Sequence, residues 1–200
     1  MLRYHARLHQ LTLGSSPYKK VKLFKKNLSI RNEIKGKPYI LRIGWDSICS
    51  DELNDLWSDV SQQYLLSILK ESKYIFWRYA DHPSQYYTLL TLKDIIQKRI
   101  VALAVVKCLG HEMIVFDLVV IDGYEVFSSF WNMLELYAIK MKTKALNIWI
   151  NVEENAARYL IEFDYKIVED VPLVIKVIST DKISQHEFFK KYIYRMGDLL

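Results

Sequence analysis

Hydrophobic side chains recur at helical spacing in three stretches of the chain. Between residues 51 and 73 they recur every three or four positions without an interrupting glycine or proline, which predicts one helix, or two with a bend. The same spacing predicts a helix over residues 125–142. Asn155 can cap a further short helix that ends near Phe163.

Extended stretches fill most of the chain between these helices. His111–Ile121 is almost continuously apolar, which is typical of a strand buried on both faces, and the short turn before it predicts a hairpin. The other expected strands are Tyr39–Ile43, Tyr86–Lys93, Arg99–Lys107, Leu146–Val152, Tyr165–Val168 and Val171–Ile178. This order predicts an α/β fold with a mixed, mostly antiparallel central sheet flanked by helices.

Composition narrows the class of protein. A chain of 200 residues with 51% apolar residues can bury a core, and none of its apolar runs reaches the roughly 18 residues of a membrane span. Cys49 and Cys108 stand alone, so we expect reduced, buried thiols in a cytoplasmic protein. The histidines lack metal-ligand spacing, and no P-loop, Rossmann or GxSxG pattern is present, which argues against metal, NTPase, dehydrogenase and hydrolase sites.

Positive charge is concentrated near the N-terminus. Residues 1–42 hold eleven lysines and arginines and one acid, so residues 43–200 hold seventeen bases and twenty-two acids, although the whole chain carries +5. We therefore expect a basic N-terminal segment over residues 1–45 and a folded domain over residues 46–200. Such a segment is typical either of an arm for an anionic partner or of a piece of a preceding unit. It contains no nucleic-acid-binding module, which disfavours nucleic acid as the partner.

A family resemblance lies in the second half of the chain. The order of strands and helices, together with the segment Asn155–Tyr165, resembles the GNAT (Gcn5-related N-acetyltransferase) superfamily over roughly residues 74–180. The segments Trp77–Pro83 and Tyr192–Asp198 look like the C-terminal half of tandem GNAT-like proteins of surface-polysaccharide biosynthesis. In that interpretation, Met1–Leu28 is similar to the end of a preceding GNAT-like unit.

The resemblance implies acetyl-CoA or another acyl-CoA as the cofactor. In the family, the backbone of the central strand pairs with the pantetheine arm, and the pyrophosphate sits on amides at the start of the next helix. Carried over to this chain, the cofactor-binding residues are Val119, Val120, Ile121, Gly123, Tyr124, Glu125, Val126, Phe127 and Asn155. The loop departs from the family pattern, because only Gly123 is small and because Asp122 and Glu125 place negative charge beside a phosphate.

The resemblance also implies candidate catalytic residues. Acyl transfer to an amine needs a base for the amine and an acid for the leaving thiolate. Asp117 and Asp122 on the central strand are candidate bases, and either can also be a plain solvent-facing acid. Tyr159 or Tyr165 is the candidate acid, and either can also be a packed tyrosine.

Arg78 and His82 are candidate substrate-binding residues, since an arginine offers two parallel hydrogen bonds to a carboxylate. The leading hypothesis is an acyl-CoA-dependent N-acyltransferase that acts on an amine of a sugar or small molecule, as a homodimer or with a partner GNAT-like unit. One alternative is a non-catalytic or aminoacyl-tRNA-dependent GNAT-like domain. Another is a module that binds an anionic partner through the basic N-terminus. The enzyme hypothesis requires the strand that ends near Ile121 to diverge from the strand through Trp149.

Overall fold

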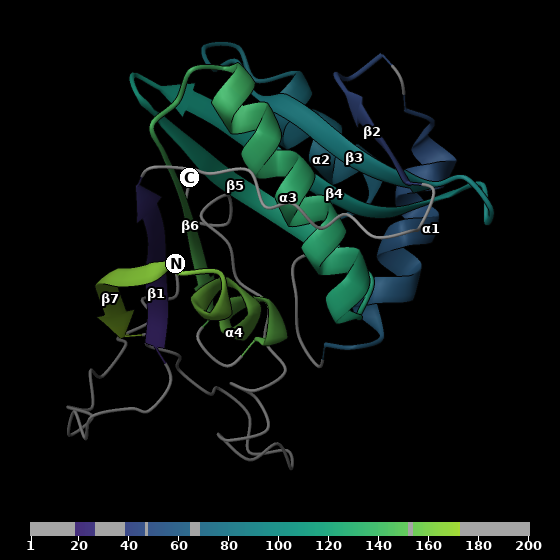
Figure 1. The fold of residues 1–200 in the computed structure, drawn as a ribbon. Helices are drawn as coiled ribbons and strands as arrows, with labels where there is room; N and C mark the ends of the chain where they lie inside the picture. The colour runs from purple at the N-terminus through teal and green to yellow at the C-terminus, as the bar shows by residue number, and fades with distance from the viewer. Residues whose placement is uncertain (1–18, 27–38, 47, 65–68, 152–153, 173–200) are drawn as a thin grey trace, which may run out of the picture.

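The described part of the chain folds around one seven-stranded sheet (Figure 1). The computed structural model describes residues 19–26, 39–46, 48–64, 69–151 and 154–172. The strands are β1 (Lys19–Lys26), β2 (Tyr39–Ile43), β3 (Thr88–Asp94), β4 (Arg99–Leu109), β5 (Glu112–Val120), β6 (Ala145–Asn151) and β7 (Lys166–Pro172). Their order in the sheet is β2-β3-β4-β5-β6-β1-β7. Neighbouring strands are antiparallel except β5 and β6, which are parallel.

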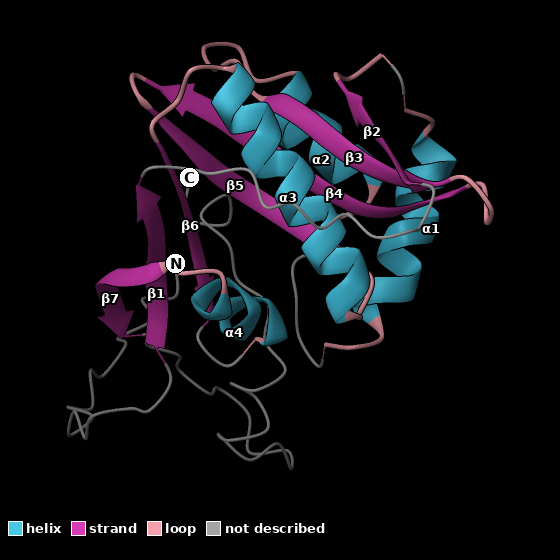
Figure 2. Ribbon diagram, viewed as in Figure 1, coloured by secondary structure: helices cyan, strands magenta, loops and turns pink. Residues whose placement is uncertain are grey.

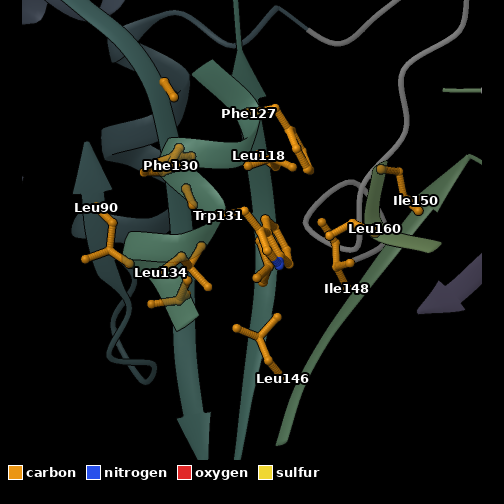
Figure 3. Packing of buried hydrophobic residues seen from close by; sticks show 14 of the residues in the cluster. Leu90, Leu118, Phe127, Phe130, Trp131, Leu134, Leu146, Ile148, Ile150 and Leu160 are labelled. Atoms are coloured by element: carbon orange, nitrogen blue, oxygen red, sulfur yellow. The ribbon is translucent and has the colours of Figure 1, made fainter. Parts of the chain in front are cut away.

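Helices cover both faces of the sheet (Figure 2). They are α1 (Ser50–Ser61), α2 (Ser72–Ile75), α3 (Tyr124–Lys140) and α4 (Asn155–Glu162), with a π-helical turn, η1 (Phe76–Ala80), directly after α2. α3 and α4 pack on one face around Trp131 (Figure 3), and α1, α2 and η1 contribute to a second apolar cluster around Trp57. Alternation along β4 separates the two clusters, because Leu103 and Val105 belong to the second and Ala104 to the first.

Most of the elements expected from the sequence are present. β2 has the expected bounds, and α3, β6 and α4 lie within two residues of theirs. The hairpin between β4 and β5 turns at Gly110, whose φ of 60° lies in the left-handed region that glycine adopts readily. The expected fold class, a mixed and mostly antiparallel sheet flanked by helices, is confirmed.

The first expected helix is shorter than the sequence indicated. It ends at Ser61, because the residues that follow close tight turns, with the amide of Gln63 donating to the carbonyl of Val60 at 3.0 Å. The helical structure that follows residue 70 is α2 and η1, and the hydrophobic spacing did not predict the π-helical turn. Residues 65–68 lie outside the described part of the chain.

The two strands expected after Tyr165 form one strand, β7, as far as the chain is described. It continues through Glu169 and Asp170, which pair with Lys22 and Val21 of β1 after a shift of register that follows Ile167. Cys49 and Cys108 are exposed rather than buried. Cys49 precedes the first turn of α1 and Cys108 lies close to a hairpin turn, and such ends of elements face solvent.

The sheet includes strands from the basic N-terminal segment. β1 lies between β6 and β7 and pairs with both, and β2 pairs with β3 at the edge farthest from β7 (Figure 1). A boundary at residue 45 therefore does not separate these two strands from the sheet. Residues 1–18 and 27–38 lie outside the described residues, as does the segment Tyr192–Asp198 that carries part of the family resemblance.

Candidate functional site

The parallel strands β5 and β6 pair over only part of their length. Glu112–Val115 lies in register with Ala145–Ile148, and no further pair of described residues joins the two strands. Each strand nevertheless continues in the sheet, because β5 stays paired with β4 as far as Val120 and β6 stays paired with β1 as far as Asn151. Figure 2 shows the two strands diverging. We call the unpaired halves, residues 116–120 of β5 and 149–151 of β6, the split.

A β-bulge marks the start of the split. Along β4, Val106 faces Val115 but the preceding Val105 faces Asp117, so Phe116 is an extra residue in β5. The extra residue puts two successive side chains on one face of the sheet. Phe116 belongs to the cluster of α1 and η1, and Asp117 bonds to a tyrosine of the same cluster. Bulges re-aim side chains in this way and are common next to active sites.

The backbone groups that face the split can be assigned from the hydrogen bonds to β4. The amide of Ile121 donates to the carbonyl of Val101 at 3.0 Å, so Ile121 faces β4. Because the backbone groups of alternate residues point to the same side of a strand, Val119 also faces β4, and Leu118 and Val120 face the split. Of the three strand residues expected to bind a cofactor arm, the backbone groups of Val120 therefore point into the split.

Asp117 is enclosed rather than exposed at the end of a strand. Its Oδ1 accepts hydrogen bonds from Lys70 Nζ at 2.7 Å and from the amide of Leu118 at 3.0 Å, and its Oδ2 accepts from the hydroxyl of Tyr79 at 3.0 Å. Asp117 and Lys70 are both fully buried. Sequence reasoning missed Lys70, although an aspartate inside an otherwise apolar strand is itself a signal that a buried partner exists.

Arg78 and His82, the candidate substrate-binding residues, lie on the same face as the bulge. The ring of His82 is 6.0 Å from the ring of Tyr87, which in turn is 5.1 Å from the ring of Phe116. Burial raises the pKa of Tyr87, and the positive charge of Arg78 acts on it in the opposite direction. The side chain of His82 also accepts a hydrogen bond from the amide of Ser84 at 3.3 Å. The structure thus places His82 one aromatic ring, that of Tyr87, away from Phe116 at the start of the split, whereas Arg78 acts on Tyr87 through its charge.

The loop expected to hold a pyrophosphate lies at the opposite side of the split, at the start of α3. Gly123 precedes the first helical residue with a φ of 140°, and among the described residues, its two chain neighbours aside, no atom lies within 4 Å of the position that a Cβ would take there. Asp122 and Glu125 are exposed, Val126 is half-buried and Phe127 is buried. The described loop therefore offers helix amides and open space but acidic side chains.

Aromatic side chains join this loop to α4. The ring of Tyr124 is 5.0 Å from the ring of Tyr159, and the ring of Phe127 is 5.3 Å from that same tyrosine. Tyr159 is half-buried, so it stays a candidate acid at the edge of this cluster. Tyr165 is 2% exposed and donates its hydroxyl proton to Glu135 Oε1 at 2.9 Å, which places it in the core behind α3.

Asn155 does not act as the cap expected from the sequence. It is the first residue of α4, the capping position belongs to Glu154, and no side-chain hydrogen bond from the described residues caps the helix. Its Oδ1 instead accepts a hydrogen bond from Arg158 at 2.9 Å. This interaction keeps the amide group of Asn155 on the exposed first turn of α4.

Trp131 provides a buried polar atom beside the split. The residue is fully buried, its ring stacks on Phe127 at 5.7 Å, and its indole Nε1 has no hydrogen-bond acceptor among the described residues. Figure 3 shows the indole between β5 and β6, near Leu118 and Ile148. Trp131 falls within the helix expected over residues 125–142, but the spacing of apolar residues could not reveal that its indole nitrogen has no acceptor among the described residues.

The described residues contain neither a cluster of metal ligands nor a membrane-spanning helix. No group of three or more histidine, cysteine, aspartate or glutamate side chains there could hold a metal ion. No described helix is long and apolar enough to cross a membrane.

Comparison with solved structures identifies the fold. No family model and no curated protein matches the sequence. A structure of a probable N-acyltransferase from Enterococcus faecalis V583 is similar with a TM-score of 0.54 and 5% identity, over 67% of this chain and 33% of its own. A functionally unknown conserved protein from Staphylococcus epidermidis is similar with a TM-score of 0.52 and 6% identity, over 75% of this chain and 57% of its own. The fold is GNAT-like. This GNAT-like chain spans about a third of the first structure and just over half of the second.

Proposed function

We propose that this chain is an N-acyltransferase in which a thioester donor and an amine acceptor meet at the split between β5 and β6. The observation that carries the proposal is the end of pairing at Val115 and Ile148 while both strands continue. Strands that part in this way expose backbone groups inside a sheet, where an extended amide chain can take the place of the missing neighbour.

The residues around the split fit the arm of an acyl-CoA. The N–H and C=O of Val120 face the split and can pair with amides of the pantetheine arm. Trp131 adds a buried N–H, and leaving such a donor unsatisfied costs about 1–3 kcal/mol, which a carbonyl of the arm would remove. When bound, the acyl-CoA supplies an activated thioester carbonyl, and every other contribution comes from the protein.

The loop at the start of α3 fits the anionic end of the cofactor through its backbone. The first amides of α3 have no intrahelical acceptor, and a helix N-terminus favours an anion. Asp122 and Glu125 act against this, because an exposed carboxylate about 6 Å from a phosphate charge repels it by about 0.7 kcal/mol in water. We therefore infer that the arm contributes more to affinity than the pyrophosphate does.

The amine acceptor approaches from the face of η1 in this proposal. His82 lies on that face one aromatic ring away from Phe116 at the bulge. Arg78 belongs to η1, and its guanidinium can hold a carboxylate on an amino sugar or another small amine. Among the candidate catalytic groups, Asp122 remains an exposed carboxylate at the end of β5, and Tyr159 lies beside the donor loop. Tyr165 is a poor candidate, since its hydroxyl proton is donated to Glu135.

Calorimetric titration with acetyl-CoA tests this proposal. We expect saturable binding that weakens about tenfold in Trp131→Phe, which keeps an aromatic ring in the core but removes the buried donor together with part of the indole volume. Trp57→Phe is the matched control, because Trp57 lies in the apolar cluster on the other face. Absence of binding at millimolar acetyl-CoA, or equal weakening by both substitutions, would contradict the proposal.

A second candidate function keeps the fold and dispenses with CoA. The acidic side chains of Asp122 and Glu125 favour it, because they disfavour a pyrophosphate at α3. In this version the chain is a non-catalytic unit or takes its acyl group from an aminoacyl-tRNA. A salt-sensitive gel shift with tRNA, combined with no heat from acetyl-CoA, would favour the tRNA version over the CoA version.

A further inference from the structure

A buried charged network lies at the point where β5 leaves β6. Asp117 and Lys70 are fully buried and Tyr79 is 2% exposed, so three polar side chains occupy the apolar cluster beside the bulge. A buried ion pair is weak evidence for stability, because well-packed apolar residues of the same volume often serve as well. The network therefore calls for an explanation other than packing.

The carboxylate of Asp117 acts on the backbone of its own strand. Its Oδ1 accepts the amide proton of Leu118 at 3.0 Å, and that amide faces the split rather than β4. If β5 and β6 stayed paired beyond Val115, the amide of Leu118 would therefore donate a hydrogen bond to β6. Lys70 Nζ at 2.7 Å and the Tyr79 hydroxyl at 3.0 Å hold the carboxylate in place from the other side.

We propose that Asp117, held by Lys70 and Tyr79, is a positioning residue that keeps β5 and β6 apart. The carboxylate accepts the Leu118 amide and so stops the ladder from closing two residues before Val120. The split-facing backbone groups of Val120 are thereby left free to bind the donor. Asp117 then acts through the backbone and not as the base that takes the proton of the amine. The role in donor binding rests on the proposed function, whereas the role in separating the strands does not.

Two double variants distinguish the effect of the hydrogen-bond acceptor at position 117 from the effect of its charge. K70M/D117N and K70M/D117L both lack the buried ion pair, but only the asparagine retains an oxygen that can accept the Leu118 amide. We expect K70M/D117N to bind acetyl-CoA within about threefold of the unmodified protein, and K70M/D117L to bind at least about tenfold more weakly. Equal affinity of the two variants would overturn the proposal.

Amide hydrogen exchange gives a measurement that needs no ligand. In the unmodified protein the Leu118 amide should exchange about as slowly as the Val119 amide, which faces β4 in every variant. Only Leu118 should exchange faster in K70M/D117L, and K70M/D117N should restore the slow rate. Fast exchange of Leu118 in the unmodified protein would overturn the proposal even if a variant failed to fold. If no acetyl-CoA binds but this exchange pattern is found, the proposed function fails and the separation of the strands by Asp117 stands.

Discussion

Replacement of Lys70 by methionine should destabilise the protein strongly. Lys70 Nζ lies 2.7 Å from Asp117 Oδ1, and both side chains are fully buried. Methionine keeps a similar length but leaves the carboxylate without its cation in an apolar cluster. Breaking a buried pair from one side costs about 3–5 kcal/mol, which corresponds to a fall in melting temperature of about 6–20 °C for a chain of this size.

The double variant K70M/D117N should recover most of that loss. It buries no charge, so the penalty for an unpaired carboxylate disappears. The amide of Leu118 can still donate to the side-chain oxygen at position 117, and the new amide nitrogen can donate to the hydroxyl oxygen of Tyr79. We expect the double variant to be more stable than K70M by about 2–3 kcal/mol, and hence a clear departure from additivity.

Urea unfolding followed by circular dichroism measures these differences at two ionic strengths. The matched control is Arg99→Met, which breaks an ion pair with Asp59 of nearly the same length, 2.6 Å, between side chains that are each 46% exposed. That substitution should lower the free energy of unfolding by less than about 1 kcal/mol, and by still less at high salt. Salt should not change the loss of stability caused by K70M. A K70M variant no less stable than the Arg99 variant would refute the reasoning about the buried network.

Three further predictions concern the donor loop and one surface pair. Gly123→Ala should lower stability by about 1–3 kcal/mol in thermal unfolding, because a φ of 140° strains any L side chain even though space for a Cβ is open; an unchanged melting temperature would contradict this geometry. Asp122→Asn with Glu125→Gln should raise the affinity for acetyl-CoA by about threefold or more in low salt, with a smaller gain at high salt. Unchanged affinity would show that these two carboxylates do not lie close to the bound donor. The hydrogen bond from Lys93 lowers the pKa of Glu52, so the stability from this pair is present above pH 4.5 and is lost as the pH falls through the lower folded value. Glu52→Gln should therefore cost about 0.5–1 kcal/mol in urea unfolding at pH 7 and nothing at pH 2, and an equal cost at both would refute the linkage.

Hydrophobic periodicity was sufficient to predict most of the fold. The continuous apolar run of β5, the stripe of α3 and the alternation of β6 each follow from which side chains face a core, and these elements lie close to their expected bounds. The place of β1 could not be predicted, because its insertion between β6 and β7 depends on pairing with strands more than a hundred residues away. Local pattern carries no information on such partners.

The candidate site could be predicted only in outline. The sequence indicated Asp117 as a polar residue in an apolar strand, but the bulge at Phe116 decides which face the carboxylate takes, and a bulge leaves no mark on hydropathy. Lys70 and the indole nitrogen of Trp131 were missed for a related reason. Their significance lies in burial beside the split, which only the packed structure defines.

An NMR titration with acetyl-CoA tests the central claim most directly, because the backbone amide and the indole N–H beside the split each have their own resonance. The Val120 amide and the Trp131 indole N–H should shift together and saturate at one ligand per chain. The Trp57 indole, on the opposite face of the sheet, should stay in place. Shifts confined to other parts of the surface, or none at millimolar ligand, would contradict the claim that a thioester donor lies between β5 and β6.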